Sequence, residues 1–115
     1  IKENNQPYSP DTVWLGTIYS KNIRLFDIQG GDIINNNRPG NSGHVVLFVR
    51  WIDENKTKFL AYEEKGGYGK ALMTELTIKY IDRGFTIGEY ENNAPGPYFA
   101  QKFYNIPWKL CKYRY

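Results

Sequence analysis

Cysteine and histidine are nearly absent from this chain of 115 residues, which contains one of each. The single cysteine, Cys111, cannot form an internal disulfide, and no pair of cysteines has the spacing of a metal site. The single histidine, His44, has no second His or Cys close to it, which argues against a structural zinc centre. We therefore expect no metal and no cofactor.

Long apolar runs are also lacking. No stretch approaches the roughly 20 residues that a helix needs to cross a bilayer, and residues 1–4 (IKEN) lack the apolar segment of a signal peptide. The formal net charge is only +3, and the Lys and Arg residues are scattered. This pattern is not a nucleic-acid footprint, so we expect neither a membrane span nor a nucleic-acid partner.

The chain is rich in aromatic residues, which make up 17% of the sequence, and in glycine and proline, with 11 and 6 copies. This composition indicates many turns and short strands around one core. Residues 44–52 (HVVLFVRWI) are the strongest element, and their apolar character on both faces predicts a strand in the middle of a sheet covered on both sides. Residues 53–56 then predict a turn and residues 57–64 a return strand. Residues 71–80 (ALMTELTIKY) carry both helix and strand formers and remain ambiguous.

His44 stands where a glycine-rich loop (residues 35–43) meets the first strand of this hairpin. A turn centred on residues 53–56 places His44 opposite residues 63–65, which include Glu63 and Glu64. Directly opposed side chains project from the same face of a sheet. A carboxylate there can orient one ring nitrogen and leave the other as a general base. The simpler interpretation is that His44 only caps the strand, with a solvated glutamate as its partner.

The residues alone supply no nucleophile for this pair. Ser42 is too close to His44 in the chain to meet the ring from across a cleft. Cys111 lies in residues 108–111 (WKLC), where no following helix lowers the pKa of a thiol, and we interpret it as a structural residue.

Two short motifs resemble the signature of the NlpC/P60 and CHAP families of cysteine amidases and peptidases. They are residues 31–34 (GDII) and residues 43–48 (GHVVLF). Residues 17–29 are similar to the segment that precedes the sheet in these families, and residues 59–63 (FLAYE) to the return strand. The resemblance covers roughly residues 12–90, within a chain that we read as one domain, or as the C-terminal part of one such domain.

This resemblance implies an α+β fold, a mostly antiparallel β-sheet with a papain-like core and few short helices. It implies that His44 is the catalytic base and Glu63 its orienting residue, with Glu64 as the fallback. The reaction would be thiolate attack on an amide, mainly in peptidoglycan stem peptides, by a secreted or cell-envelope protein. We take Trp51, Tyr62 and Tyr68 as the substrate-binding residues.

The families carry their cysteine on a helix N-terminal to the region matching residues 12–19, and this sequence has none there. The chain begins at Ile1 rather than Met, which favours a C-terminal fragment whose cysteine lies on an upstream segment or a second chain. The sequence is also compatible with a degenerate, non-catalytic relative or with a permuted enzyme in which the cysteine follows the histidine.

Two further function classes remain open. The first is a non-catalytic carbohydrate- or cell-wall-binding β-module, with exposed tyrosines as stacking platforms. The candidates, in or beside predicted loops, are Tyr68, Tyr90, Tyr98 and Tyr104. The second is a basic ribonuclease, which is weaker because no second basic catalytic cluster accompanies His44.

Overall fold

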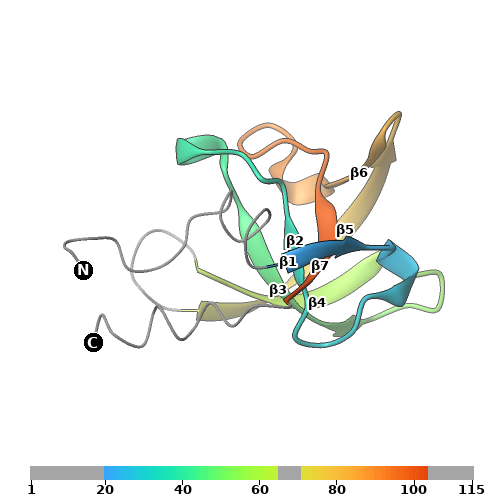
Figure 1. Cartoon of the computed structure of the whole chain (residues 1–115). Helices are drawn as coiled ribbons and strands as arrows, with labels where there is room; N and C mark the ends of the chain where they lie inside the picture. Colours follow the sequence, from blue (N-terminus) through green and yellow to red (C-terminus); the bar gives the residue numbers. More distant parts are fainter. Residues whose placement is uncertain (1–19, 65–70, 104–115) are drawn as a thin grey trace.

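Seven antiparallel strands form one strongly curved sheet in the computed structural model, which describes residues 20–64 and 71–103 (Figure 1). The strands are β1 (Ser20–Ile23), β2 (Ile33–Asn35), β3 (Val45–Trp51), β4 (Lys58–Glu64), β5 (Ala71–Ile81), β6 (Gly84–Ile87) and β7 (Phe99–Phe103). Three short 3-10 turns lie between them, η1 (Leu25–Asp27), η2 (Gly40–Ser42) and η3 (Gly88–Tyr90).

The strand order is β1-β7-β2-β3-β4-β5-β6. The sheet curls until its two halves meet, because Phe85 of β6 forms a bridge with Tyr98, the residue before β7. The amide of Tyr98 donates to the carbonyl of Phe85 at 2.8 Å. In Figure 1, β1 and β7 lie side by side, as their pairing requires. The connection between β6 and β7 is therefore brought back against the inner face of the sheet.

The predicted hairpin is confirmed. β3 pairs antiparallel with β4, and β3 is the fourth of the seven strands in the sheet. Asp53 fixes the turn, because its Oδ1 accepts from the amides of Thr57 and Lys58 at 2.8 and 2.9 Å. Lys56, in the same turn, has a positive φ of 58°.

A β-bulge at Val49, between Phe48 and Arg50, interrupts the alternation of side chains between the two faces of β3. Phe48 and Trp51, three residues apart, therefore both turn towards Phe59, with ring centroids 5.7 and 6.1 Å from it. The turn at residues 29–32 packs on this bulge: a Cβ added at Gly30 would lie 2.9 Å from the carbonyl oxygen of Val49. Close backbone approach thus explains a glycine in this turn.

The core lies inside the curve of the sheet. Its main members are buried side chains from six strands and their connections: Ile28, Ile34, Val46, Phe48, Phe59, Ala61, Leu76, Ile78, Phe85, Ile87, Tyr98 and Ala100. The expectation that the central strand is covered on both sides is wrong. Val46 is 1% exposed, but Leu47, on the opposite face, is 37% exposed. Leu47, Tyr62 and Met73 pair across three strands and leave an apolar row on the outer face.

The predicted α+β class is also wrong. Strands make up 54% of the described residues, and no helix of seven or more residues occurs among them, so the fold is a small compact β domain. The ambiguous residues 71–80 form strand β5. Its early helix formers are overridden by pairing with β4, whereas β6 pairs only with the end of the strand, residues 78–81. Residues 12–19, where the resemblance to the cysteine amidase and peptidase families begins, lie outside the described residues.

Within residues 20–64 and 71–103, no helix has the length and apolar character needed to cross a membrane.

Candidate functional site

His44 is the residue immediately before β3, and its position is fixed through its backbone. The side chain of Asn36, 4% exposed, accepts from the amide of His44 at 2.9 Å, and the amide of Asn36 donates to the carbonyl of His44 at 3.2 Å. Asn36 also donates to the carbonyl of Pro95 at 3.2 Å. The glycine-rich loop that precedes His44 is thereby tied to the connection between β6 and β7.

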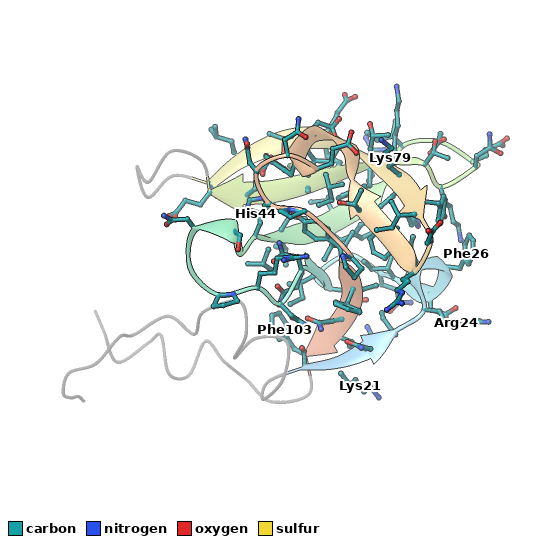
Figure 2. All side chains as sticks on the ribbon, turned by 90° about the horizontal axis from the view of Figure 1, so that it is seen from above. Lys21, Arg24, Phe26, His44, Lys79 and Phe103 are labelled. Carbon is teal, nitrogen blue, oxygen red and sulfur yellow. The ribbon has the colours of Figure 1, made fainter. Side chains whose placement is uncertain are left out.

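The side chain of His44 turns to the inner face of the sheet and is 20% exposed. Figure 2 shows it inward of the periphery, where Lys21, Arg24 and Phe26 project away from the ribbon. Its Nε2 lies 3.1 Å from Oε1 of Glu63 on β4. Leu47 of β3 pairs with Tyr62 of β4, and continuing this register by one residue sets Glu63 opposite Val46. Side chains two residues apart share a face, so Glu63 projects from the same face as His44. The predicted contact between His44 and a glutamate of the return strand is therefore confirmed, and the glutamate is Glu63.

Glu63 is a buried carboxylate with strong donors on both oxygens. Its side chain is 0% exposed. The hydroxyl of Thr74, on β5, donates to Oε2 at 2.5 Å, and the hydroxyl of Tyr90, in η3, donates to Oε1 at 2.5 Å. Oε1 thus faces both Tyr90 and His44. Donors of this kind compensate the loss of water around a buried carboxylate.

These contacts decide the charge of Glu63. Burial raises the pKa of a carboxyl group, whereas hydrogen bonds from Thr74, Tyr90 and His44 lower it. The hydrogen bonds outweigh the burial, and the pKa of Glu63 lies below its ordinary value. An ionised carboxylate can only accept. The proton between His44 and Glu63 therefore resides on Nε2.

Tyr90 contacts both members of the pair. Its ring centroid lies 4.5 Å from that of His44, with the planes tilted by 54°. Burial raises the pKa of Tyr90, and the hydrogen bond to Glu63 raises it further. Its hydroxyl therefore keeps its proton and remains a donor to Oε1 at neutral pH.

The arrangement can serve as a general base. With the proton held on Nε2, Nδ1 of a neutral ring carries the free lone pair. No described residue forms a hydrogen bond with Nδ1 of His44. A partially exposed imidazole, oriented by a buried carboxylate, can remove a proton from an acidic group that approaches Nδ1.

The remaining predicted site residues are not brought to His44. Glu64 follows Glu63 on β4, so its exposed side chain points to the outer face, and so does that of Tyr62. Trp51 lies at the far end of β3, roughly 20 Å along the strand, and packs against Phe48 and Phe59. Tyr68 lies outside the described residues.

The tyrosines expected as stacking platforms have different roles where they are described. Tyr98 is 2% exposed and donates to the carbonyl of Ala94 at 2.6 Å. Tyr90 donates to Glu63 and packs against His44. Tyr104 and the thiol of Cys111 lie outside the described residues.

Thr74 is a site residue that sequence reasoning missed, and Tyr90 was expected only as a stacking platform. Thr74 had a signal: if residues 71–80 are read as a strand that returns along β4, Glu63 pairs with Leu72 and Thr74 lies next along the same face. The role of Tyr90 had none, because it reaches Glu63 from η3, which follows β6 and is bonded to β5 through Glu89 and Thr77. Among the described residues, no three His, Cys, Asp or Glu side chains gather into a group that could hold a metal ion.

The chain matches no protein-family model, no curated protein and no solved structure.

Proposed function

We propose that this chain supplies the general base of a cysteine amidase or peptidase, with His44 as the base and Glu63 as its orienting residue. The observation that supports this most strongly is the 3.1 Å contact between Nε2 of His44 and the buried Oε1 of Glu63. It leaves Nδ1 as the basic nitrogen, which is the arrangement that activation of a nucleophile requires. The short motifs around Gly31-Asp32 and Gly43-His44, similar to those of the NlpC/P60 and CHAP families, point to a thiol as that nucleophile.

The proposed reaction begins when Nδ1 of His44 takes the proton of a cysteine thiol. The thiolate then attacks the carbonyl carbon of an amide, and the C–N bond breaks as the imidazolium returns the proton to the departing amine. Water, deprotonated by the same nitrogen, then attacks the carbonyl carbon of the thioester. The C–S bond breaks, the acid leaves, and the cysteine sulfur recovers the proton from the imidazolium. Glu63 stabilises the imidazolium that forms in each half of the cycle.

The proposed source of the thiol lies beyond these 115 residues, on an upstream segment or a second chain. The families that the sequence resembles carry the cysteine before the region matching residues 12–19. Cys111, the only cysteine in the sequence, is assigned a structural role.

The proposed substrates are peptide amides of peptidoglycan, and the proposed location is the cell envelope or the secreted fraction. Both follow from the resemblance of the motifs, and the mild positive charge of +3 suits an anionic wall polymer.

A hydrolysis assay on purified peptidoglycan tests the proposal, with newly released amino groups as the readout. We expect no turnover from the 115 residues alone. We expect turnover when the upstream cysteine-bearing segment is added in cis or as a separate chain, and its loss on thiol alkylation and in His44→Ala. Cys111→Ser should retain activity. Activity of the isolated chain, or its loss in Cys111→Ser, would move the nucleophile to Cys111.

A non-catalytic wall-binding module is the second candidate, and the outer face favours it. Tyr62 is 42% exposed between Leu47 and Met73, 37% and 45% exposed, in a row that offers an apolar surface to a sugar ring. Peptidoglycan binding that survives His44→Ala and is lost in Tyr62→Ser, with no hydrolysis in any form of the protein, would select this function.

A further inference from the structure

The contacts around Glu63 go further than a pair of base and carboxylate, because Tyr90 touches both. Its hydroxyl donates to the oxygen that His44 uses, and its ring lies against the imidazole. One side chain therefore restrains the carboxylate and the ring together. Thr74, by contrast, reaches only Oε2.

Tyr90 is itself held in place independently of the pair. The amides of Asn93 and Ala94 donate to its carbonyl at 3.1 and 2.8 Å. Glu89, the preceding residue, accepts from the amide of Thr77 on β5 at 2.9 Å and from its hydroxyl at 3.1 Å. The turn η3 is thus hydrogen-bonded to β5 on one side and to its own following loop on the other. These bonds fix the backbone of Tyr90 without any contribution from His44 or Glu63.

Without the hydroxyl of Tyr90, the carboxylate would lose the donor that shares Oε1 with His44. Glu63 is fully buried, so water does not readily replace that donor. Oε1 would then be held less firmly than Oε2, which keeps the bond from Thr74, and the alignment of the carboxylate with Nε2 would loosen. Second partners of this kind commonly set the orientation and tautomer of an imidazole.

We propose that Tyr90 is a positioning residue that holds Glu63 against Nε2 of His44, and so selects the tautomer in which Nδ1 accepts the proton. This role rests on the proposed function of His44 as a base. It acts through Glu63 and the ring, and requires no contact between Tyr90 and the substrate.

The chain offers a clean test, because His44 is its only histidine. Long-range proton–nitrogen NMR spectra of the 15N-labelled 115-residue chain, at a pH where the ring is neutral, distinguish Nε2–H from Nδ1–H without ambiguity. We expect the Nε2–H tautomer to dominate in the wild type by at least about tenfold, the factor that a charge-assisted hydrogen bond of ordinary strength supplies. In Tyr90→Phe, which keeps the ring and removes the hydroxyl, the Nδ1–H fraction should rise several-fold.

Tyr80→Phe is the matched control, since Tyr80 is 56% exposed and its hydroxyl forms no hydrogen bond to a described side chain at the site. It should leave the tautomer ratio unchanged. An unchanged ratio in Tyr90→Phe, or a wild type that carries its proton on Nδ1, would overturn the proposal. If Tyr90→Phe does not fold, wild-type NOEs between the rings of His44 and Tyr90 decide: their presence together with Nε2–H supports the role, and their absence removes it.

The NMR experiment tests the role of Tyr90 and the hydrolysis assay tests the proposed function, so either claim can be refuted while the other stands. Loss of hydrolysis in every form of the protein, with the tautomer shift intact, would remove the proposed function and leave Tyr90 as an orienting residue. Hydrolysis that depends on His44, with no tautomer shift in Tyr90→Phe, would keep the function and remove the role of Tyr90.

Discussion

At the scale of single residues, Glu63 is the side chain on which the site depends. It is a buried charge that donors from separate parts of the described chain hold in place, among them His44 before β3, Thr74 on β5 and Tyr90 in η3. A buried carboxylate without such donors would take up a proton instead. The site therefore exists only when the strands and η3 are assembled, and its charge reports on that assembly.

Glu63 should make stability depend on pH. Because its pKa is lower in the folded state than its ordinary value of 4.5, its contribution is complete above that value and is lost as the pH falls through the folded pKa. Urea unfolding should show Glu63→Gln destabilised by about 2 kcal/mol at pH 7, with the difference from wild type shrinking below pH 4.5. Glu64→Gln, on the exposed face, is the control and should follow wild type throughout. A difference that stays constant down to about pH 3 would contradict an ionised Glu63.

At the scale of elements, the hairpin of β3 and β4 could be predicted because its pattern is local. Residues 45–51 are β-branched or aromatic almost throughout, and Asp53 marks the turn. The position of this turn also predicted that the partner of His44 is Glu63 or Glu64. Residues 71–80 could not be assigned, since Ala71, Leu72 and Met73 favour a helix and only their pairing with β4 makes them a strand. That uncertainty is also why Thr74 was missed.

The coverage of the central strand could not be predicted for a related reason. A strand that is apolar on both faces indicates burial on both, but the curvature of this sheet closes only over the face of Val46 and Phe48. Curvature arises from the bulge at Val49 and the bridge between Phe85 and Tyr98, which are properties of the assembled sheet.

The approach of the turn at Gly30 to the bulge of β3 carries an element-scale prediction. In Gly30→Ala, the new methyl group would meet the carbonyl oxygen of Val49 at 2.9 Å, so either the turn or the bulge must shift. We expect a loss of about 1–3 kcal/mol in urea unfolding. Gly88→Ala is the matched control, because its methyl group would find ordinary contacts at 3.8 Å from Thr77, and it should change stability by less than about 0.5 kcal/mol. Equal stability of the two variants would show that the turn yields to the methyl group at little cost.

At the scale of the whole molecule, the closure of the sheet brings the site together. Tyr98 stands at the seam: it bridges to Phe85, is 2% exposed, and anchors the loop before β7 through its bond to the carbonyl of Ala94. The same loop carries Pro95, whose carbonyl accepts from Asn36, the residue that holds the backbone of His44. A chain of hydrogen bonds thus connects Tyr98, where the sheet closes, with the backbone of His44 at the site.

Removing the hydroxyl at the seam should therefore weaken the whole molecule. Tyr98→Phe leaves the carbonyl of Ala94 without its donor and should cost about 1–2 kcal/mol in denaturant unfolding. Tyr80→Phe removes a hydroxyl from a side chain that is 56% exposed and should be neutral. Exchange of the amide hydrogens of Ala94 and Gly96 should also speed up in Tyr98→Phe. Unchanged stability and unchanged exchange would mean that the hydroxyl of Tyr98 does not contribute to the closure of the sheet.

The central claim is that Glu63 orients His44 as a general base, and one kinetic comparison tests it most directly. With the cysteine-bearing segment present, kcat for amide hydrolysis should fall by about 10²–10⁴-fold in His44→Ala, and by a smaller factor, about tenfold or more, in Glu63→Gln, with KM little changed in either. Glu64→Gln, one residue away but on the opposite face, should retain kcat to within about twofold. A kcat that is unaffected by Glu63→Gln, or that falls equally in Glu64→Gln, would contradict the orienting role of Glu63.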